Sequence, residues 1–267
     1  MGGSSRPHKS KSPFRSPCNS SYINSSHGEV MTPAKAADFF IDSLEEFRLK
    51  EQITNFVLAG HSLGGYLSAR YAIKYGSCEQ LLLISPVGIA PHPNIQSKIS
   101  IDDLSFGMRA FASAWKWNFT PQQLIRSLGP KGLQLVQNTL LRRFNKSRWN
   151  SDELQLIANY LYHITVASGS GEYALNSLLE PIASTSGVSV YAREPLAEAL
   201  ASIRTPTLLL YGDRDWLHPK DLSNYYSLWK SNNSPIDISI IPRSGHHLYL
   251  DNSVDFHESI RAWMQKG

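Results

Sequence analysis

The stretch FVLAGHSLGGYLSARYAIKYG, Phe56 to Gly76, places a serine between two glycines in the pentapeptide Gly60-His61-Ser62-Leu63-Gly64. The apolar run that precedes this serine predicts a buried parallel strand, and a helix-like pattern follows it. A Gly-x-Ser-x-Gly sequence between a strand and a helix is the context of a nucleophile elbow, a sharp turn that exposes the serine hydroxyl. The pattern therefore predicts that Ser62 is a nucleophile, and the alternative is a serine in a structural turn.

The residues around Ser62 suit the chemistry of such a turn. We expect a side chain at Gly60 or Gly64 to clash where strand and helix pack closely, and Gly65 to allow the helix still closer. The helix N-terminus carries a positive partial charge. The amide of Leu63 is therefore the predicted donor to an oxyanion.

A serine nucleophile needs a base, which is expected in a loop beyond the last strand. The chain has nine histidines, and the segment IIPRSGHHLYLDN places His246 and His247 just after the apolar run 236–242. We predict that His246 is the general base, with His247 as its rival. A structural pair of histidines is the alternative.

The acid is expected after the preceding strand, since the chain order of such sites is serine, acid, histidine. The segment LLLYGDRDWLHP offers Asp213 and Asp215 at that point. We predict that Asp215 holds the imidazole in the correct tautomer and stabilises the imidazolium. Asp213 is expected to cap the turn or to face solvent.

Strand and helix patterns alternate along the chain and predict an α/β fold with a doubly wound parallel sheet. A helix is expected to begin at Thr32, which can cap it, with Pro33 at its first position. The expected strands are 53–60, 80–91, 205–212 and 236–242. Strand signals stop for about 110 residues between the second and third of these, and the further expected helices are 101–115, 121–128, 130–144, 151–166, 219–232 and 252–265.

The helical block between the second and third strands predicts a separate cap. The expected organisation is a loop or disordered segment over 1–31, the first part of the core over 32–95, the cap over 96–200 and the second part of the core over 201–267.

Composition excludes several classes of protein. With 267 residues, 42% of them hydrophobic, the chain can bury a substantial core. No apolar run reaches the roughly 18 residues that span a bilayer. Two cysteines do not make a disulfide scaffold or a cysteine-based zinc site. No metal cluster or nucleotide-binding glycine loop stands out, so no cofactor is predicted.

Basic residues are concentrated in two acid-free segments, four in 1–28 and eight in 104–151. Without these twelve charges, the net charge of +4 becomes −8 for the rest of the chain. The second segment also carries large apolar residues: Phe106, Met108, Phe111, Trp115, Trp117, Phe119 and Trp149. Aromatic and basic residues together suit an anionic membrane surface. The alternatives are a solvated basic face and ordinary core packing, and no motif supports nucleic-acid binding.

Several segments together resemble one branch of the α/β-hydrolase superfamily. The branch includes cardiolipin-specific deacylases, N-acyl-phosphatidylethanolamine lipases and a triglyceride-lipase coactivator. The resemblance runs from about residue 32 to the C-terminus. It rests on AADFFIDSLEEFR, GHSLGGYLSARYAIKYG, LLLISPVGIA, GPKGLQLVQ, YGDRDW and SGHHLYLDN.

The resemblance implies an α/β-hydrolase fold with a helical cap and an acyl-lipid substrate, such as cardiolipin or another phospholipid. It also implies acyltransferase activity toward lysophosphatidic acid, linked to a His-x-x-x-x-Asp motif at His246 and Asp251. The reaction expected first is hydrolysis through Ser62, Asp215 and His246. A catalytically impaired lipid-binding or lipase-regulating protein and a soluble small-ester hydrolase are the alternatives.

Two further expectations concern location and the start of the chain. A peripheral membrane protein is expected, in mitochondria first, with the cytoplasm or a lipid droplet as alternatives. The start MGGSSRP resembles a loop that follows the oxyanion loop of family members. We therefore expect a chain that begins within the domain and lacks its first strands, as a gene-model or splice fragment would. Loss of one oxyanion donor typically costs about 10²–10³ in rate.

Overall fold

The computed structural model of the chain describes residues 31–91, 120–143, 150–184 and 187–265. The chain divides into two compact units. The sheet unit comprises Thr32–Asp103 and Leu178–Gly267, and the helical unit comprises Met1–Met31 and Leu104–Ser177. Each unit has a core of its own.

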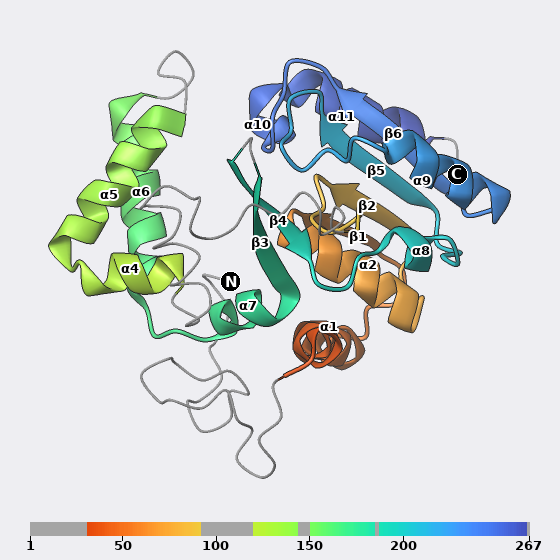
Figure 1. Cartoon of the computed structure of the whole chain (residues 1–267), viewed down its shortest axis with the longest axis horizontal. Coiled ribbons are helices and arrows are strands. Elements are labelled where there is room, and N and C mark those ends of the chain that lie inside the picture. Colours follow the sequence, from red (N-terminus) through yellow and green to blue (C-terminus); the bar gives the residue numbers. More distant parts are fainter. Residues whose placement is uncertain (1–30, 92–119, 144–149, 185–186, 266–267) are drawn as a thin grey trace, which may run out of the picture. The chain divides into compact units, whose positions relative to one another are not determined.

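Parallel strands form the centre of the sheet unit, as the alternating pattern of the sequence predicted. The order in the sheet is β1 (Val57–His61), β2 (Gln80–Ile84), β5 (Thr207–Gly212) and β6 (Ile236–Ile241). All three neighbouring pairs are parallel, so the carboxyl ends of these strands meet at one edge of the sheet (Figure 1). Each strand falls within a predicted range or begins or ends within a residue of it.

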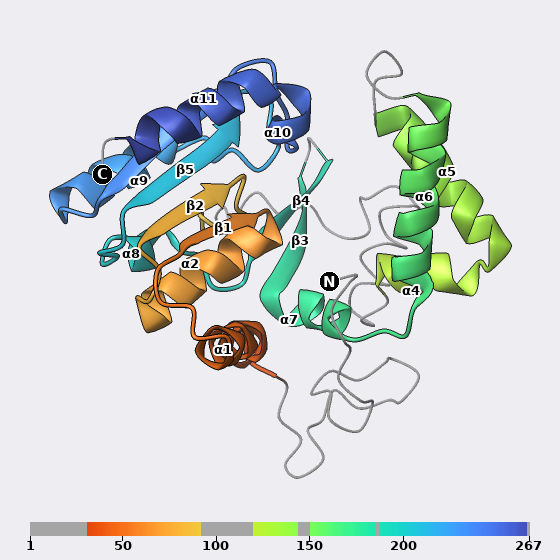
Figure 2. The same ribbon diagram turned by 180° about the vertical axis from the view of Figure 1, so that it is seen from behind.

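Helices follow the strands and pack on both faces of the sheet (Figure 2). Their bounds are α1 (Pro33–Lys50), α2 (Leu63–Tyr75), α8 (Ala197–Leu200), α9 (Leu222–Ser231), α10 (Leu248–Asp251) and α11 (Ser253–Met264). The predicted start of the first helix is confirmed, because the side chain of Thr32 accepts a hydrogen bond from the amide of Lys35 and Pro33 is the first helical residue. A proline there lacks only an amide that would have no partner inside the helix.

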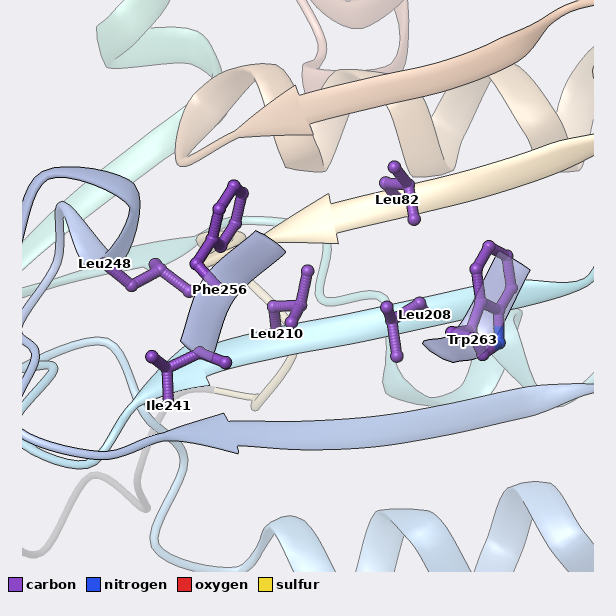
Figure 3. Close-up of a cluster of buried hydrophobic side chains, with 7 residues drawn as sticks. All are labelled: Leu82, Leu208, Leu210, Ile241, Leu248, Phe256 and Trp263. Atoms are coloured by element: carbon purple, nitrogen blue, oxygen red, sulfur yellow. The ribbon is translucent and has the colours of Figure 1, made fainter. Parts of the chain in front are cut away.

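The hydrophobic core between the sheet and α11 explains why the strands read as continuous apolar runs. Its buried residues are Leu82, Leu208, Leu210, Ile241, Leu248, Phe256 and Trp263 (Figure 3). Side chains alternate along a strand, so Leu81, Leu83 and Leu209 point to the opposite face, and they too are at most 1% exposed. Burial on both faces is what an inner parallel sheet requires.

An antiparallel hairpin of β3 (Leu179–Ser184) and β4 (Gly187–Ala192) also belongs to this sheet unit. The expectation that strand signals stop between the second and third parallel strands was wrong here. Pro181 pairs with Val190 inside the hairpin. Because proline weakens a strand pattern and is confined to edges, its presence concealed β3 in the sequence.

The described part of the helical unit is built from α4 (Pro121–Ser127), α5 (Pro130–Arg143), α6 (Ser151–Val166), a 3-10 helix (Gly171–Ala174) and most of α7 (Leu175–Leu178). The predicted helices 121–128, 130–144 and 151–166 are confirmed, whereas the predicted helix 101–115 lies outside the described residues. Val136, Leu140 and Ala158 form the small core of the unit. None of the helices in the described ranges is both long and apolar enough to cross a membrane.

Candidate active site

Ser62 occupies the bend between β1 and α2, with φ of 56° and ψ of −118°. A non-glycine residue at positive φ is strained by about 1–3 kcal/mol, and such strain persists only where the surrounding structure holds it. Here the backbone is held on both sides. The amide of Ser62 donates to Ile84 O at 3.0 Å, while its carbonyl accepts from Tyr66 and Val87 at 3.1 and 3.2 Å.

The glycines of the bend do not all serve one purpose. A Cβ atom on Gly60 would overlap the carbonyl of Gly64 and the hydroxyl of Ser68, and one on Gly65 would lie 2.9 Å from Pro86 Cβ. The prediction of close packing is therefore confirmed for Gly60 and Gly65. It was wrong for Gly64, where a Cβ atom would meet no atom within 4 Å. Gly64 contributes to the close packing through its backbone, because its carbonyl is the atom that a Cβ on Gly60 would overlap.

Asp215 and His246 lie together at the carboxyl edge of the sheet. Asp215 Oδ1 is 3.2 Å from His246 Nδ1, and the Asp215 side chain is fully buried. Burial opposes ionisation of this carboxyl, but the hydrogen bond with His246, the nearby hydroxyl of Ser85 and the hydrogen bond from the amide of Leu217 lower the pKa of Asp215 below its ordinary value. A buried carboxylate that accepts from an imidazole is the arrangement that fixes a catalytic tautomer.

Asp213 has a different task from Asp215. Its two carboxylate oxygens accept the amides of Arg243 and Ser244 at 2.9 and 3.0 Å, and these hydrogen bonds lower its pKa, the one from Arg243 contributing most. The loop after β5 is thereby bound to the loop after β6. The amide of Arg214 adds a hydrogen bond to Ser244 O at 3.0 Å.

The same two loops touch so closely that the last residue of β5 has to be glycine. A Cβ atom on Gly212 would overlap the carbonyl of Ser244 and would lie 2.5 Å from the carbonyl of Gly245. Backbone atoms cannot withdraw as a flexible side chain can. The approach of the loop that carries His246 therefore depends on Gly212, a role that the sequence analysis missed.

Ser62 is connected to the Asp215–His246 pair through its neighbour His61. His61 Nε2 is 2.8 Å from the carbonyl of His246, and the two rings lie 4.7 Å apart. Burial, more than any nearby charge, lowers the pKa of His61, so this ring is neutral near pH 7. His247 also packs on His61, at 5.3 Å between ring centres. Within the described ranges, no hydrogen bond joins the Ser62 hydroxyl to His246.

The other predicted site residues lie nearby. Leu63 is the first residue of α2, and the first amides of a helix have no partner within it. The Asp251 carboxylate accepts the amide of Gly245 at 2.8 Å, so it contacts the loop that presents His246. Two residues of this region were not identified from the sequence. Ser85 is fully buried beside Asp215, and Trp216, 57% exposed, lies 5.4 Å from the His246 ring.

The predicted membrane-binding residues of the cap are only partly visible. The seven large apolar residues of that prediction, from Phe106 to Trp149, lie outside the described residues. Among the basic residues, Arg126 pairs with Glu172 at 2.6 Å, whereas Lys131 and Arg142 are exposed.

Comparison with known proteins agrees with the fold. The alpha/beta hydrolase family model matches residues 8–258. A 1-acylglycerol-3-phosphate O-acyltransferase of Arabidopsis thaliana is 31% identical over 228 residues, covering 83% of this chain and 52% of the relative. The 1-acylglycerol-3-phosphate O-acyltransferase ABHD5 of Homo sapiens is 28% identical over 226 residues, covering 83% and 61%. The chain thus spans between half and two thirds of the length of these relatives.

Solved structures share the fold. A carboxylesterase from Bacillus subtilis gives a TM-score of 0.51 at 17% identity, over 88% of this chain and 67% of its own. An esterase from Exiguobacterium antarcticum gives 0.51 at 16% identity, over 86% and 74%. Together with the strand–serine–helix bend and the parallel sheet, these matches show that the chain belongs to the alpha/beta hydrolase family, and that its homologues include ABHD5-type 1-acylglycerol-3-phosphate O-acyltransferases.

Proposed function

We propose that this chain transfers the acyl group of a lipid ester through Ser62, with His246 as general base and Asp215 as the acid that orients it. The observation that carries the proposal is the buried Asp215–His246 pair, 3.2 Å apart, next to a strained serine turn. A serine hydroxyl is a weak nucleophile until an adjacent base activates it. His246 lies at the same edge of the sheet as Ser62, which supports its proposed role as that base.

The proposed reaction has two halves. Ser62 Oγ attacks the ester carbonyl while His246 Nε2 takes its proton, and the amide of Leu63 donates to the oxygen that becomes negative. His246 then gives the proton to the departing alkoxide, which leaves an acyl-serine. In the second half, His246 takes a proton from the acceptor hydroxyl as that oxygen attacks the acyl-serine carbonyl. The acyl group moves to the acceptor, and His246 returns the proton to the departing Ser62 Oγ.

The acceptor distinguishes a hydrolase from an acyltransferase. Water would release a fatty acid, whereas the free hydroxyl of 1-acylglycerol-3-phosphate would yield a diacylated phospholipid. We infer the second acceptor because the relatives carry that activity in their names. Phospholipids, including cardiolipin, are the proposed acyl donors.

A fluorophosphonate probe tests the nucleophile directly. We expect the probe to label the wild-type chain and to leave Ser62→Ala unlabelled, and we expect Ser227→Ala, an exposed serine of α9, to label normally. Equal labelling of Ser62→Ala would refute the assignment. Incubation with a radiolabelled phospholipid, with and without 1-acylglycerol-3-phosphate, then separates the two reactions by product: fatty acid for hydrolysis and diacylglycerol phosphate for transfer.

Contact with a membrane surface is the proposed means of substrate access. On α5, the exposed Leu135 and Leu141 lie close to the exposed Lys131 and Arg142. On α6, Leu156 is 69% exposed. Apolar side chains with cations beside them suit the headgroup region of an anionic bilayer. Peripheral membrane association follows, and a mitochondrial membrane stays a prediction.

A second candidate function is lipid binding without turnover, which would make the chain a regulator of lipid metabolism. The observation in its favour is that the Ser62 hydroxyl and His246 make no hydrogen bond in the described structure. Catalytic hydrogen bonds are often long before substrate binds, so this geometry does not exclude catalysis. Vesicle binding combined with an absence of both probe labelling and ester turnover would favour the regulator.

A further inference from the structure

Ser85 is the first residue after β2 and lies between the two halves of the candidate site. Its amide donates to Leu210 O of β5 at 2.8 Å, and the carbonyl of its neighbour Ile84 accepts the amide of Ser62. The residue is 0% exposed, and its φ of 43° is in the left-handed region. A strained backbone thus delivers a buried hydroxyl to the edge of the sheet where Asp215 lies.

Two buried polar atoms at this edge of the sheet have complementary hydrogen-bonding capacity. Ser85 Oγ and Asp215 Oδ2 are both buried, and neither has a hydrogen-bond partner within the part of the chain that the structure describes. A carboxylate oxygen only accepts hydrogen bonds, whereas a hydroxyl can donate. Buried polar groups in folded proteins are nearly always paired. The side chain of Ser85 is also near enough to lower the pKa of Asp215.

The other oxygen of the same carboxylate is already occupied. Asp215 Oδ1 lies 3.2 Å from His246 Nδ1 and accepts the amide of Leu217 at 3.0 Å. A carboxylate held through only one oxygen can rotate about its last bond, which would move Oδ1 away from the imidazole. A donor on Oδ2 removes that freedom.

We propose that Ser85 is a positioning residue whose hydroxyl donates to Asp215 Oδ2 and so holds the carboxylate toward His246. The proposal deepens the proposed function and rests on it in one respect, because the effect on rate requires a working Ser62. The effect on the protonation of His246 does not require it.

The sign of the expected pH effect follows from the charge on Asp215. Without the Ser85 donor, the carboxylate can turn Oδ1 away from His246 Nδ1 and holds the His246 imidazolium less strongly, so the pKa of His246 should fall. Other titratable groups face this pair: His61 and His247 pack on His246, and Tyr211 lies near Asp215. Burial keeps two of them neutral at pH 7, since it lowers the pKa of His61 and raises that of Tyr211.

Two variants separate the hydroxyl from the strained backbone. Ser85→Ala and Ser85→Gly both remove the hydroxyl, but glycine relieves the positive φ while alanine does not. An effect of losing the hydroxyl should therefore be equal in Ser85→Ala and Ser85→Gly. An effect of backbone strain or of stability should differ between the two variants. Ser234→Ala is the matched control, because Ser234 is 2% exposed and donates to Ala201 O at 2.5 Å, just before the amino end of β6.

The experiment measures the His246 imidazole by NMR in histidine-labelled protein, with the peak assigned through His246→Gln. We expect its pKa to fall in Ser85→Ala and Ser85→Gly by the same amount, and to be unchanged in Ser234→Ala. Labelling of Ser62 by the fluorophosphonate should slow about three- to tenfold in both Ser85 variants, as expected for one lost hydrogen bond. KM for a short ester should be unchanged.

An unaltered pKa of His246 in both variants overturns the proposal, as does a shift in Ser85→Gly alone, which would show an effect of relieved strain. Failure of the proposed function looks different. Wild-type protein would then resist the probe altogether, while the NMR titration would still report whether Ser85 acts on Asp215 and His246.

Discussion

The two compact units carry their polar groups in different places. In the sheet unit, polar atoms that water would normally solvate are buried together, among them those of Ser85 and Asp215. In the helical unit, the cations Lys131 and Arg142 are exposed on the same helix as the exposed apolar residues Leu135 and Leu141. Both units expose apolar side chains, and α1 of the sheet unit exposes Phe47 and Leu49. Burying polar groups and exposing apolar ones both cost free energy. We therefore test the proposed chemistry in the first unit and the proposed surface binding in the second.

The largest expected effect tests the buried carboxylate of the sheet unit. Asp215→Asn keeps the shape of the side chain but favours the wrong imidazole tautomer, so we expect kcat/KM to fall about 10⁴-fold. Asp213→Asn is the matched control. It weakens hydrogen bonds to the loop amides, so it should lower the melting temperature and reduce kcat/KM far less. Equal losses in the two variants would contradict the division of roles between Asp213 and Asp215.

A second test concerns the glycines of the serine bend. Gly60→Ala forces a Cβ atom into the carbonyl of Gly64, and we expect the free energy of unfolding to fall by about 3 kcal/mol or more. Gly64→Ala meets open space in the first turn of α2 and should be neutral or stabilising, since alanine favours helix by about 1 kcal/mol. Denaturant titration measures both. A destabilised Gly64→Ala variant would show that the bend requires glycine at position 64 as well as at position 60.

The helical unit is tested by removing its exposed cations. The double variant Lys131→Gln, Arg142→Gln should bind vesicles of phosphatidylcholine with one fifth phosphatidic acid about thirtyfold more weakly, at about 1 kcal/mol for each charge. The control double variant Lys50→Gln, Lys220→Gln removes two exposed lysines of the sheet unit. Flotation that weakens equally in both pairs would mean that total charge, not this surface, decides the binding.

The smallest expected effect concerns the contact between helices α1 and α2. Hydrogen bonding from Arg48 and, to a smaller extent, from Tyr71 lowers the pKa of Glu45 to about 2, from 4.5 in the absence of partners, although burial opposes this shift. A lowered folded-state pKa gives stability above pH 4.5 that is lost as the pH falls toward 2. Glu45→Gln should therefore flatten the fall in unfolding free energy over this range. An identical pH dependence in wild type and variant would rule out this contribution.

Much of this fold was predictable from local sequence. The parallel strands, the bend at Ser62 and the order of serine, acid and base all leave short patterns of apolar runs, glycines and polar loop residues. The β3–β4 hairpin did not, because Pro181 interrupts its first strand. Gly64 was misread because the direction of a missing side chain depends on packing.

The candidate site was predictable only in part, for a related reason. Asp213 and Asp215 are two residues apart in the same loop, and both carry a carboxylate suited to either role. Burial separates them, since the Asp215 side chain is inaccessible while that of Asp213 is 41% exposed. The proposed role of Ser85 could not be predicted from the local sequence, because it depends on proximity to Asp215, which lies 130 residues away in the chain.

The close contact between the loops after β5 and β6 has a consequence for how this chain can be rearranged. Asp213 binds the amides of Arg243 and Ser244, so the loops that carry Asp215 and His246 are fastened to each other rather than through the helix that connects them in sequence. We therefore expect the alignment of these loops to survive a break in the covalent link through α9. New termini opened after Asn232 in a circular permutant should leave the spacing of acid and base intact.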